Sequence, residues 1–132
     1  MTKILSKIKT SLFPSNFKAT KAPIDQKVVF HVMYDSLLVG KLSLEDGEWT
    51  FKYSDQFKSQ SEINKLTEFP DLNKEYKSAD LWPFFVVRIP SIQQPKVKKI
   101  ISTEGIDDSD QVALLKRFGE NTIVNPFTLV LG

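Results

Sequence analysis

Residues 28–53 read VVFHVMYDSLLVGKLSLEDGEWTFKY and contain three runs with the composition of β-strands. The first run, 28–34, is β-branched and aromatic, and the second covers 37–44. The dipeptide Asp46-Gly47, which is favoured in two-residue hairpin turns, separates the second run from the third, 48–53. The pattern predicts a three-stranded antiparallel meander.

Alternation of side chains predicts that this meander has one apolar face. In the second run the residues expected on that face are Leu38, Gly40, Leu42 and Leu44. In the third run they are Trp49, Phe51 and Tyr53. Such a sheet is only marginally stable until its apolar face is covered, so later elements are expected to pack on it.

Two helices are predicted beyond residue 90 as the cover. Pro95 begins the first and Gly105 ends it. Asp108 or Ser109 is expected to cap the second, with Asp110 in its first turn. Its apolar positions are Val112, Leu115 and Phe118, and Gly119 is expected to end it. The predicted fold class is α+β: a small antiparallel sheet covered by two C-terminal helices.

Two further segments complete the predicted sheet. Between residues 54 and 77 we expect a short helix around Ile63 to Leu66 and a strand near Tyr76. Residues 127–131 are typical of a strand, and Pro126 places its start at a sheet edge or a bend. The meander is therefore expected to gain additional strands.

Length and composition indicate one domain with a basic arm. The 132 residues are 41% hydrophobic and 26% charged, which is typical of a globular chain and not of a disordered one. No cysteine is present, so disulfides and thiolate metal sites are excluded. No apolar run is long enough to span a membrane. We expect a cytoplasmic protein with a domain over 27–132 and an arm over 1–26.

The arm differs in charge from the rest of the chain. Residues 1–24 contain five lysines and no acidic residue, while the whole chain has a net charge of +2. Helical spacing of Ile4, Leu5, Ile8 and Leu12 fits a short amphipathic helix. A solvated arm, docking on a partner protein, and contact with nucleic acid or an anionic surface all fit this composition.

No residue pattern in the chain predicts catalysis, a cofactor or a metal ion. The single histidine, His31, lies within a predicted strand and is expected to be structural. The acidic run 107–110 fits a helix start better than a calcium loop, because it lacks the closing glutamate. No glycine-rich phosphate loop is present. We therefore expect a protein that is not an enzyme.

The strongest candidate for binding is the run 79–90, ADLWPFFVVRIP, which carries three aromatic residues close to two prolines. Pro83 disfavours the α conformation at the residue before it, so a rigid bend is expected there. The run fits a core plug, and it also fits a partner contact, because tryptophan is enriched at binding hot spots. The residues assigned to partner binding are Trp82, Pro83, Phe84, Phe85 and Arg88.

The order of the motifs over residues 27–120 resembles a known family. The motifs are Leu38-Val39-Gly40-Lys41-Leu42, the run 47–53, Pro83-Phe84-Phe85, and Gly105-Ile106-Asp107-Asp108 followed by Ala113-Leu114-Leu115 and Gly119. Together they resemble the N-terminal subdomain of HipA-type serine/threonine kinases. Those kinases continue into a large catalytic domain that this chain lacks, so we expect it not to be the kinase itself.

The resemblance implies a binding function. Free-standing versions of the subdomain resemble HipS, the small component of tripartite HipBST systems. This implies an antitoxin that neutralises a separately encoded HipT-like serine/threonine kinase, with a HipB-like helix-turn-helix protein as a further partner and no sequence-specific nucleic acid binding of its own. Two alternatives remain: a non-inhibitory scaffold or activating subunit, and a regulator that contacts nucleic acid through the arm.

Overall fold

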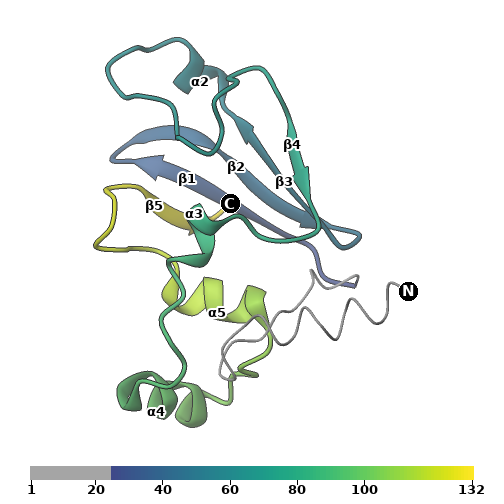
Figure 1. Ribbon diagram of the computed structural model, residues 1–132, viewed down its shortest axis with the longest axis vertical. Helices are drawn as coiled ribbons and strands as arrows, with labels where there is room; N and C mark the ends of the chain where they lie inside the picture. The colour runs from purple at the N-terminus through teal and green to yellow at the C-terminus, as the bar shows by residue number, and fades with distance from the viewer. Residues whose placement is uncertain (1–24) are drawn as a thin grey trace.

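The structure is a computed structural model that describes residues 25–132, so the predicted arm lies almost entirely outside the described residues. The strands are β1 (Val28–Tyr34), β2 (Leu37–Glu45), β3 (Glu48–Tyr53), β4 (Tyr76–Ser78) and β5 (Thr128–Leu131). The helices are α2 (Asp55–Lys58), α3 (Pro83–Val86), α4 (Pro95–Glu104) and α5 (Gln111–Phe118). Figure 1 shows the sheet above α5 and α4.

The strands form one antiparallel sheet in the order β4-β3-β2-β1-β5. The predicted meander is confirmed as its three central strands, and the strand predicted near Tyr76 extends it on one side. The C-terminal strand lies at the opposite edge, beside β1, as the proline before it indicated. The α+β fold class is confirmed.

The turn between β2 and β3 explains why the meander forms with this register. Asp46 and Gly47 both have positive φ, at 52° and 75°. Two successive positive φ values are typical of a type I′ turn, whose twist matches the twist of the strands that it joins. Glu45 therefore pairs with Glu48 directly beside the turn.

A bulge changes the predicted face of β2. Val32 pairs with Gly40 but Met33 pairs with Leu38, which leaves Val39 as an extra residue on β2. An extra residue reverses the alternation beyond it. Val39 is therefore fully buried, and the prediction that Leu38 shares the core face with the later leucines is wrong.

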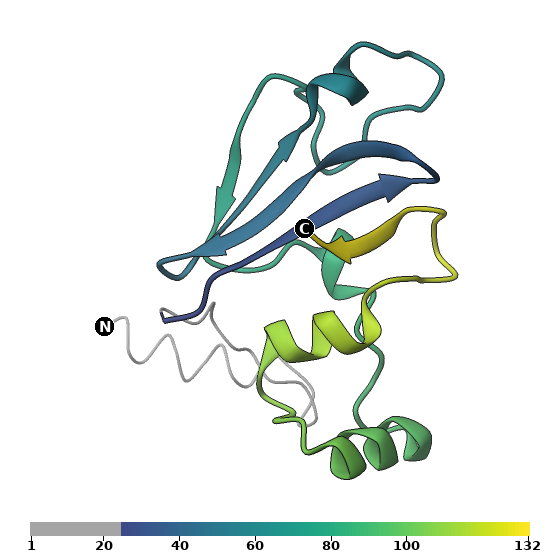
Figure 2. The same cartoon turned by 180° about the vertical axis from the view of Figure 1, so that it is seen from behind.

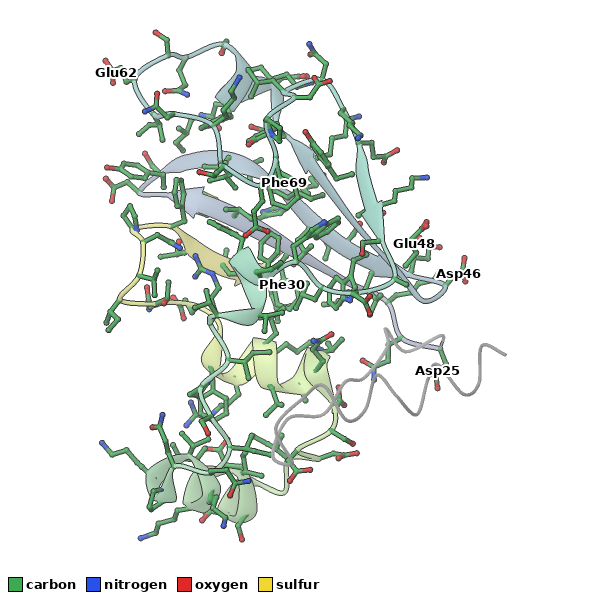
Figure 3. All side chains as sticks on the ribbon, viewed as in Figure 1. Asp25, Phe30, Asp46, Glu48, Glu62 and Phe69 are labelled. Atoms are coloured by element: carbon green, nitrogen blue, oxygen red, sulfur yellow. The ribbon has the colours of Figure 1, made fainter. Side chains whose placement is uncertain are left out.

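The core lies on the predicted apolar face of the sheet, where Trp49, Phe51 and Tyr53 are at most 2% exposed. Figure 3 labels Phe30 and Phe69 near the centre of the molecule, while Asp46 lies at its periphery. The covering residues come from several segments: Phe57, Leu66, Phe69, Phe85, Val112 and Leu115. The cover is thus shared among α2, the loop that follows it, α3 and α5.

The two C-terminal helices are unequal as a cover. Helix α5 supplies two residues to the core cluster, whereas the buried Val97 of α4 does not belong to that cluster. Figures 1 and 2 both show α4 beyond α5, on the side away from the sheet. Gly105 ends α4 in the left-handed conformation, as predicted.

The cap of α5 differs from the predicted cap. Asp110 is the N-cap, and its Oδ1 accepts a hydrogen bond from the Ala113 amide at 3.1 Å. The two residues predicted as caps were Asp108 and Ser109. Instead, the amide and hydroxyl of Ser109 both donate to Asp107 Oδ1, at 2.9 and 2.7 Å, so that Ser109 belongs to the preceding turn.

The helix predicted around Ile63 to Leu66 is absent, and α2 forms earlier instead. Ser54 caps α2 by accepting a hydrogen bond from the Phe57 amide at 3.0 Å. After α2, the Gln60 side chain accepts from the Ile63 amide at 2.8 Å and donates to its carbonyl at 3.0 Å. These side-chain bonds take the place of helical bonds, so the segment stays a loop.

Candidate partner-binding site

The bend at Trp82-Pro83 is the start of helix α3. Pro83 occupies the first helical position, where its missing N–H would have no helical partner anyway. Trp82 is the N-cap residue and is extended, with φ −68° and ψ 150°, because the following proline disfavours the α conformation. The predicted rigid bend is confirmed, and a short regular element holds the aromatic run.

Trp82 is half-buried and makes T-shaped ring contacts with two core phenylalanines. Its ring centroid lies 5.2 Å from that of Phe69 at an interplanar angle of 79°, and 6.4 Å from that of Phe85 at 60°. Edge-to-face contacts of this kind are favourable for aromatic pairs. Trp82 is therefore anchored in the core and reaches the surface, and its contact with a partner stays a prediction.

The two phenylalanines of α3 have different environments. Phe85 is fully buried, with its ring centroid 6.0 Å from Phe51 and 6.2 Å from Phe69. Phe84 is half-buried and meets the ring of Phe127 at 5.9 Å. Phe85 is therefore the core plug of the run, while Phe84 joins α3 to the segment before β5.

Arg88 is buried, at 3% exposure, and holds the loop between α5 and β5. Its Nη1 donates to the carbonyls of Gly119 and Glu120 at 3.1 and 3.2 Å. Its Nη2 donates to Asn125 Oδ1 at 3.0 Å and to the Phe127 carbonyl at 2.8 Å. The guanidinium thus ties both ends of this loop to the end of α3.

Burial lowers the pKa of the Arg88 guanidinium to about 10, because the protein replaces the water that would solvate its charge. At neutral pH the group is still a cation. Its Nε has no hydrogen-bond partner among residues 25–132. The Arg88 guanidinium carbon also lies 5.5 Å from the centroid of the Phe84 ring, within cation–π distance.

Large apolar side chains are exposed in the two segments that Arg88 joins, the end of α3 and the loop between α5 and β5. Val87, directly after α3, is 46% exposed, and Ile123 and Val124 in the loop are 103% and 64% exposed. Because residues three or four apart lie on one side of a helix, Pro83 and Phe84 share a side with Val87. We refer to Trp82, Pro83, Phe84 and Val87 as the α3 ridge.

The structure divides the five residues assigned to partner binding. Trp82, Pro83 and Phe84 lie at least partly at the surface, whereas Phe85 and Arg88 lie in the interior. Sequence reasoning missed Val87 and the loop acceptors of Arg88. An arginine within an apolar run was the available signal, because a buried cation needs partners.

A surface pocket lies elsewhere, within the loop that follows α2. Its volume is about 470 Å³, and its lining includes Phe57, Ile63, Leu66 and Leu72. None of the residues assigned to partner binding lines it. Across residues 25–132, His, Asp and Glu side chains form no group able to hold a metal ion, and no helix is long and apolar enough to cross a bilayer.

Comparison with known proteins gives one match. The family described as the HipA N-terminal domain matches residues 30–123, which includes the sheet meander from Phe30 onward, the α3 ridge and both C-terminal helices. No curated protein and no solved structure matches the chain significantly.

Proposed function

Because this chain belongs to the HipA N-terminal domain family, it is a HipA-related toxin–antitoxin component, and we propose that it is an antitoxin. In this proposal it is a non-catalytic, cytoplasmic binding protein. It associates with a separately encoded HipA/HipT-like serine/threonine kinase and neutralises it. A HipB-like helix-turn-helix protein would be a further partner.

The geometry of Trp82 carries the proposal. Its ring is fixed by Phe69 and Phe85 on one side, so little conformational entropy is lost when the other side is covered by a partner. Rigid aromatic side chains of this kind dominate binding energy at protein interfaces. In the proposed complex the α3 ridge contacts the kinase, Trp82 occupies or adjoins its catalytic cleft, and Phe85 and Arg88 hold the ridge in place.

The decisive experiment compares Trp82→Ala with the unchanged chain in binding to the purified kinase. Loss of a buried aromatic anchor typically costs about 2 kcal/mol or more, so the dissociation constant should rise more than tenfold. Isothermal titration calorimetry measures this constant, and a phosphorylation assay with and without this chain measures neutralisation.

Two controls keep the result interpretable. Leu131→Ala removes an exposed apolar side chain of β5, outside the α3 ridge, and should bind as the unchanged chain does. Circular dichroism must show that Trp82→Ala is folded. Unchanged binding by folded Trp82→Ala would contradict the role of this side chain, and absence of any complex would contradict the proposal as a whole.

The alternatives differ in measurable ways. A scaffold or activating subunit would form the complex but leave phosphorylation unchanged or raise it. A regulator acting on nucleic acid through its arm would show salt-sensitive binding to DNA or RNA that disappears when residues 1–24 are removed.

A further inference from the structure

The sheet has a second face that no other described element covers. Figure 2 shows β1, β2 and β5 in front, with α3 behind them and α5 and α4 below. On this side Val29 is 40% exposed, and the side chains of Lys41 and Lys52 are exposed. We refer to this side of the sheet as the open face.

Basic side chains gather on the open face because of the register. Lys41 of β2 pairs directly with Lys52 of β3 on one side and with His31 of β1 on the other. In the next row across the sheet, Thr50 pairs with Lys77 of β4. Three lysines and the imidazole thus lie in two adjacent rows of paired strand residues, and Glu75, directly before β4, is the carboxylate at their end.

The charges of the three lysines are poorly compensated. Within residues 25–132, neither Lys41 nor Lys52 makes an ion pair, and Lys77 reaches Glu75 at 4.0 Å, the limit for such a contact. Like charges directly opposite each other destabilise a sheet. The pair Lys41 and Lys52 therefore costs stability in the isolated chain, and an anionic partner would remove that cost.

We propose that the open face is a second docking surface, which receives a carboxylate-bearing surface of the partner protein. The inference rests on the proposed function, since the partner is the kinase. The α3 ridge lies on the core side of the sheet, so the two surfaces are separate.

The composition of the open face favours a protein over nucleic acid. Proteins that bind single strands on a sheet stack bases on aromatic side chains. Every aromatic residue of the five strands belongs to the core cluster or packs against it, so none serves the open face. Next to the lysine rows, Glu45 pairs with Glu48 across the strands and with Lys27 in an ion pair of 3.2 Å. Glu48 would repel a polyanion, whereas a protein surface can place a cation there.

The arm of this chain is an unsuitable occupant. Residues 1–24 carry five lysines and no acidic residue, so their charge has the same sign as the lysine rows. An exposed valine beside the lysines adds apolar contact area, which suits a protein interface with a polar rim.

The test measures binding of the full chain to the purified kinase at about 50 mM and 200 mM salt. Lys41→Glu/Lys52→Glu should weaken binding at least tenfold and reduce its salt dependence. The matched control is Lys96→Glu/Lys98→Glu, which makes the same charge change on exposed positions of α4 and should stay within twofold. Equal binding by both double variants and the unchanged chain would overturn the inference but leave the proposed function intact.

Two other outcomes have distinct meanings. If the unchanged chain does not bind the kinase, the proposed function fails and this inference fails with it. A short single-stranded oligonucleotide and a short duplex serve as further probes. If the Lys41→Glu/Lys52→Glu variant loses binding to either probe but keeps its affinity for the kinase, the open face binds nucleic acid and the inference is wrong.

A stability measurement separates a docking role from a structural one. Lys52→Glu replaces a like-charge pair with an opposite-charge pair across β2 and β3, so its melting temperature should rise while its affinity for the kinase falls. A fall in melting temperature together with the fall in affinity would indicate that Lys52 supports the fold, and would overturn the inference.

Discussion

At the residue scale, Arg88 is a buried cation whose two terminal nitrogens donate hydrogen bonds within the protein. Four of its hydrogen bonds reach residues 31 to 39 positions away in the sequence, so it joins segments that the chain itself does not bring together. Bonds from a charged donor are stronger than those from a neutral one. Arg88 therefore supports both the α3 ridge and the loop before β5.

We expect Arg88→Ala to lower the free energy of unfolding by about 3 kcal/mol, because four carbonyl and amide oxygens lose a charged donor. Urea denaturation followed by circular dichroism measures the loss. The control is Arg117→Ala, which removes the exposed ion pair with Glu104, 2.8 Å long, and should stay close to the unchanged chain. Similar losses in both variants would contradict the role assigned to Arg88.

Tyr53 is a second buried polar residue with a defined partner set. Its hydroxyl donates to the Phe69 carbonyl at 2.7 Å and accepts from the Leu66 amide at 2.8 Å. These bonds tie the covering loop to β3. We expect Tyr53→Phe to lower the free energy of unfolding by about 1 to 2 kcal/mol, because two buried backbone groups lose their partner.

The difference in free energy of unfolding between Tyr53→Phe and the unchanged chain depends on pH. Burial raises the pKa of the Tyr53 hydroxyl from 10.0 to about 12, so the folded state holds this proton more tightly than the unfolded state. The contribution of the Tyr53 hydroxyl to the free energy of unfolding is complete below pH 10 and is lost as the pH rises towards about 12. The stability difference between the unchanged chain and Tyr53→Phe should therefore shrink over that window in urea titrations. A difference that stays constant to pH 12 would contradict this assignment.

At the element scale, Gly40 in β2 and Gly105 at the end of α4 are required for different physical reasons. A Cβ at Gly40 would lie 2.6 Å from the Lys52 carbonyl oxygen and 2.8 Å from the Phe51 ring. A Cβ at Gly105 would have no heavy atom within 4 Å, but its φ of 66° is left-handed. The first position requires space and the second requires a backbone conformation.

We expect Gly40→Ala to cost about 2 to 3 kcal/mol, because backbone and a packed ring must both shift. Gly105→Ala should cost about 1 kcal/mol, which is the penalty for left-handed backbone alone. Thermal unfolding of both variants measures which substitution costs more stability. Gly105→Asn should recover part of the loss, since asparagine tolerates this conformation; a Gly105→Ala variant worse than Gly40→Ala would contradict the argument.

At the scale of the whole molecule, the core cluster runs from Val28 to Leu129 and draws on the sheet, α2, the covering loop, α3 and α5. We therefore expect a chain of residues 25–132 to fold cooperatively, with a melting temperature within a few degrees of that of the full chain. Differential scanning calorimetry measures this. A truncated chain that fails to unfold in one transition would show that residues 1–24 contribute to the fold.

The same truncated chain tests the function of the arm. In the proposed function both docking surfaces lie within residues 25–132, so removal of residues 1–24 should leave affinity for the kinase nearly unchanged. A tenfold or greater loss of affinity from the folded, truncated chain would show that the arm is a major contact.

Much of the fold follows from interactions between neighbours in the sequence. Strand β1 was predictable from its β-branched and aromatic residues, β2 and β3 from alternation, the turn between them from Asp46-Gly47, and α4 from Pro95 and Gly105, because each signal acts within a few residues. The position of Trp82 at a bend was predictable in the same way, since a proline restricts the residue before it.

Only the tertiary structure decided the remaining features. The bulge at Val39, the loop that covers the sheet and the burial of Phe85 and Arg88 all depend on contacts between distant segments. The same holds for the lysines of the open face, because alternation places each on a side while only the register places Lys41 opposite Lys52. A local pattern specifies which way a side chain points along its own element; which partner it meets there is set by how the elements pack together.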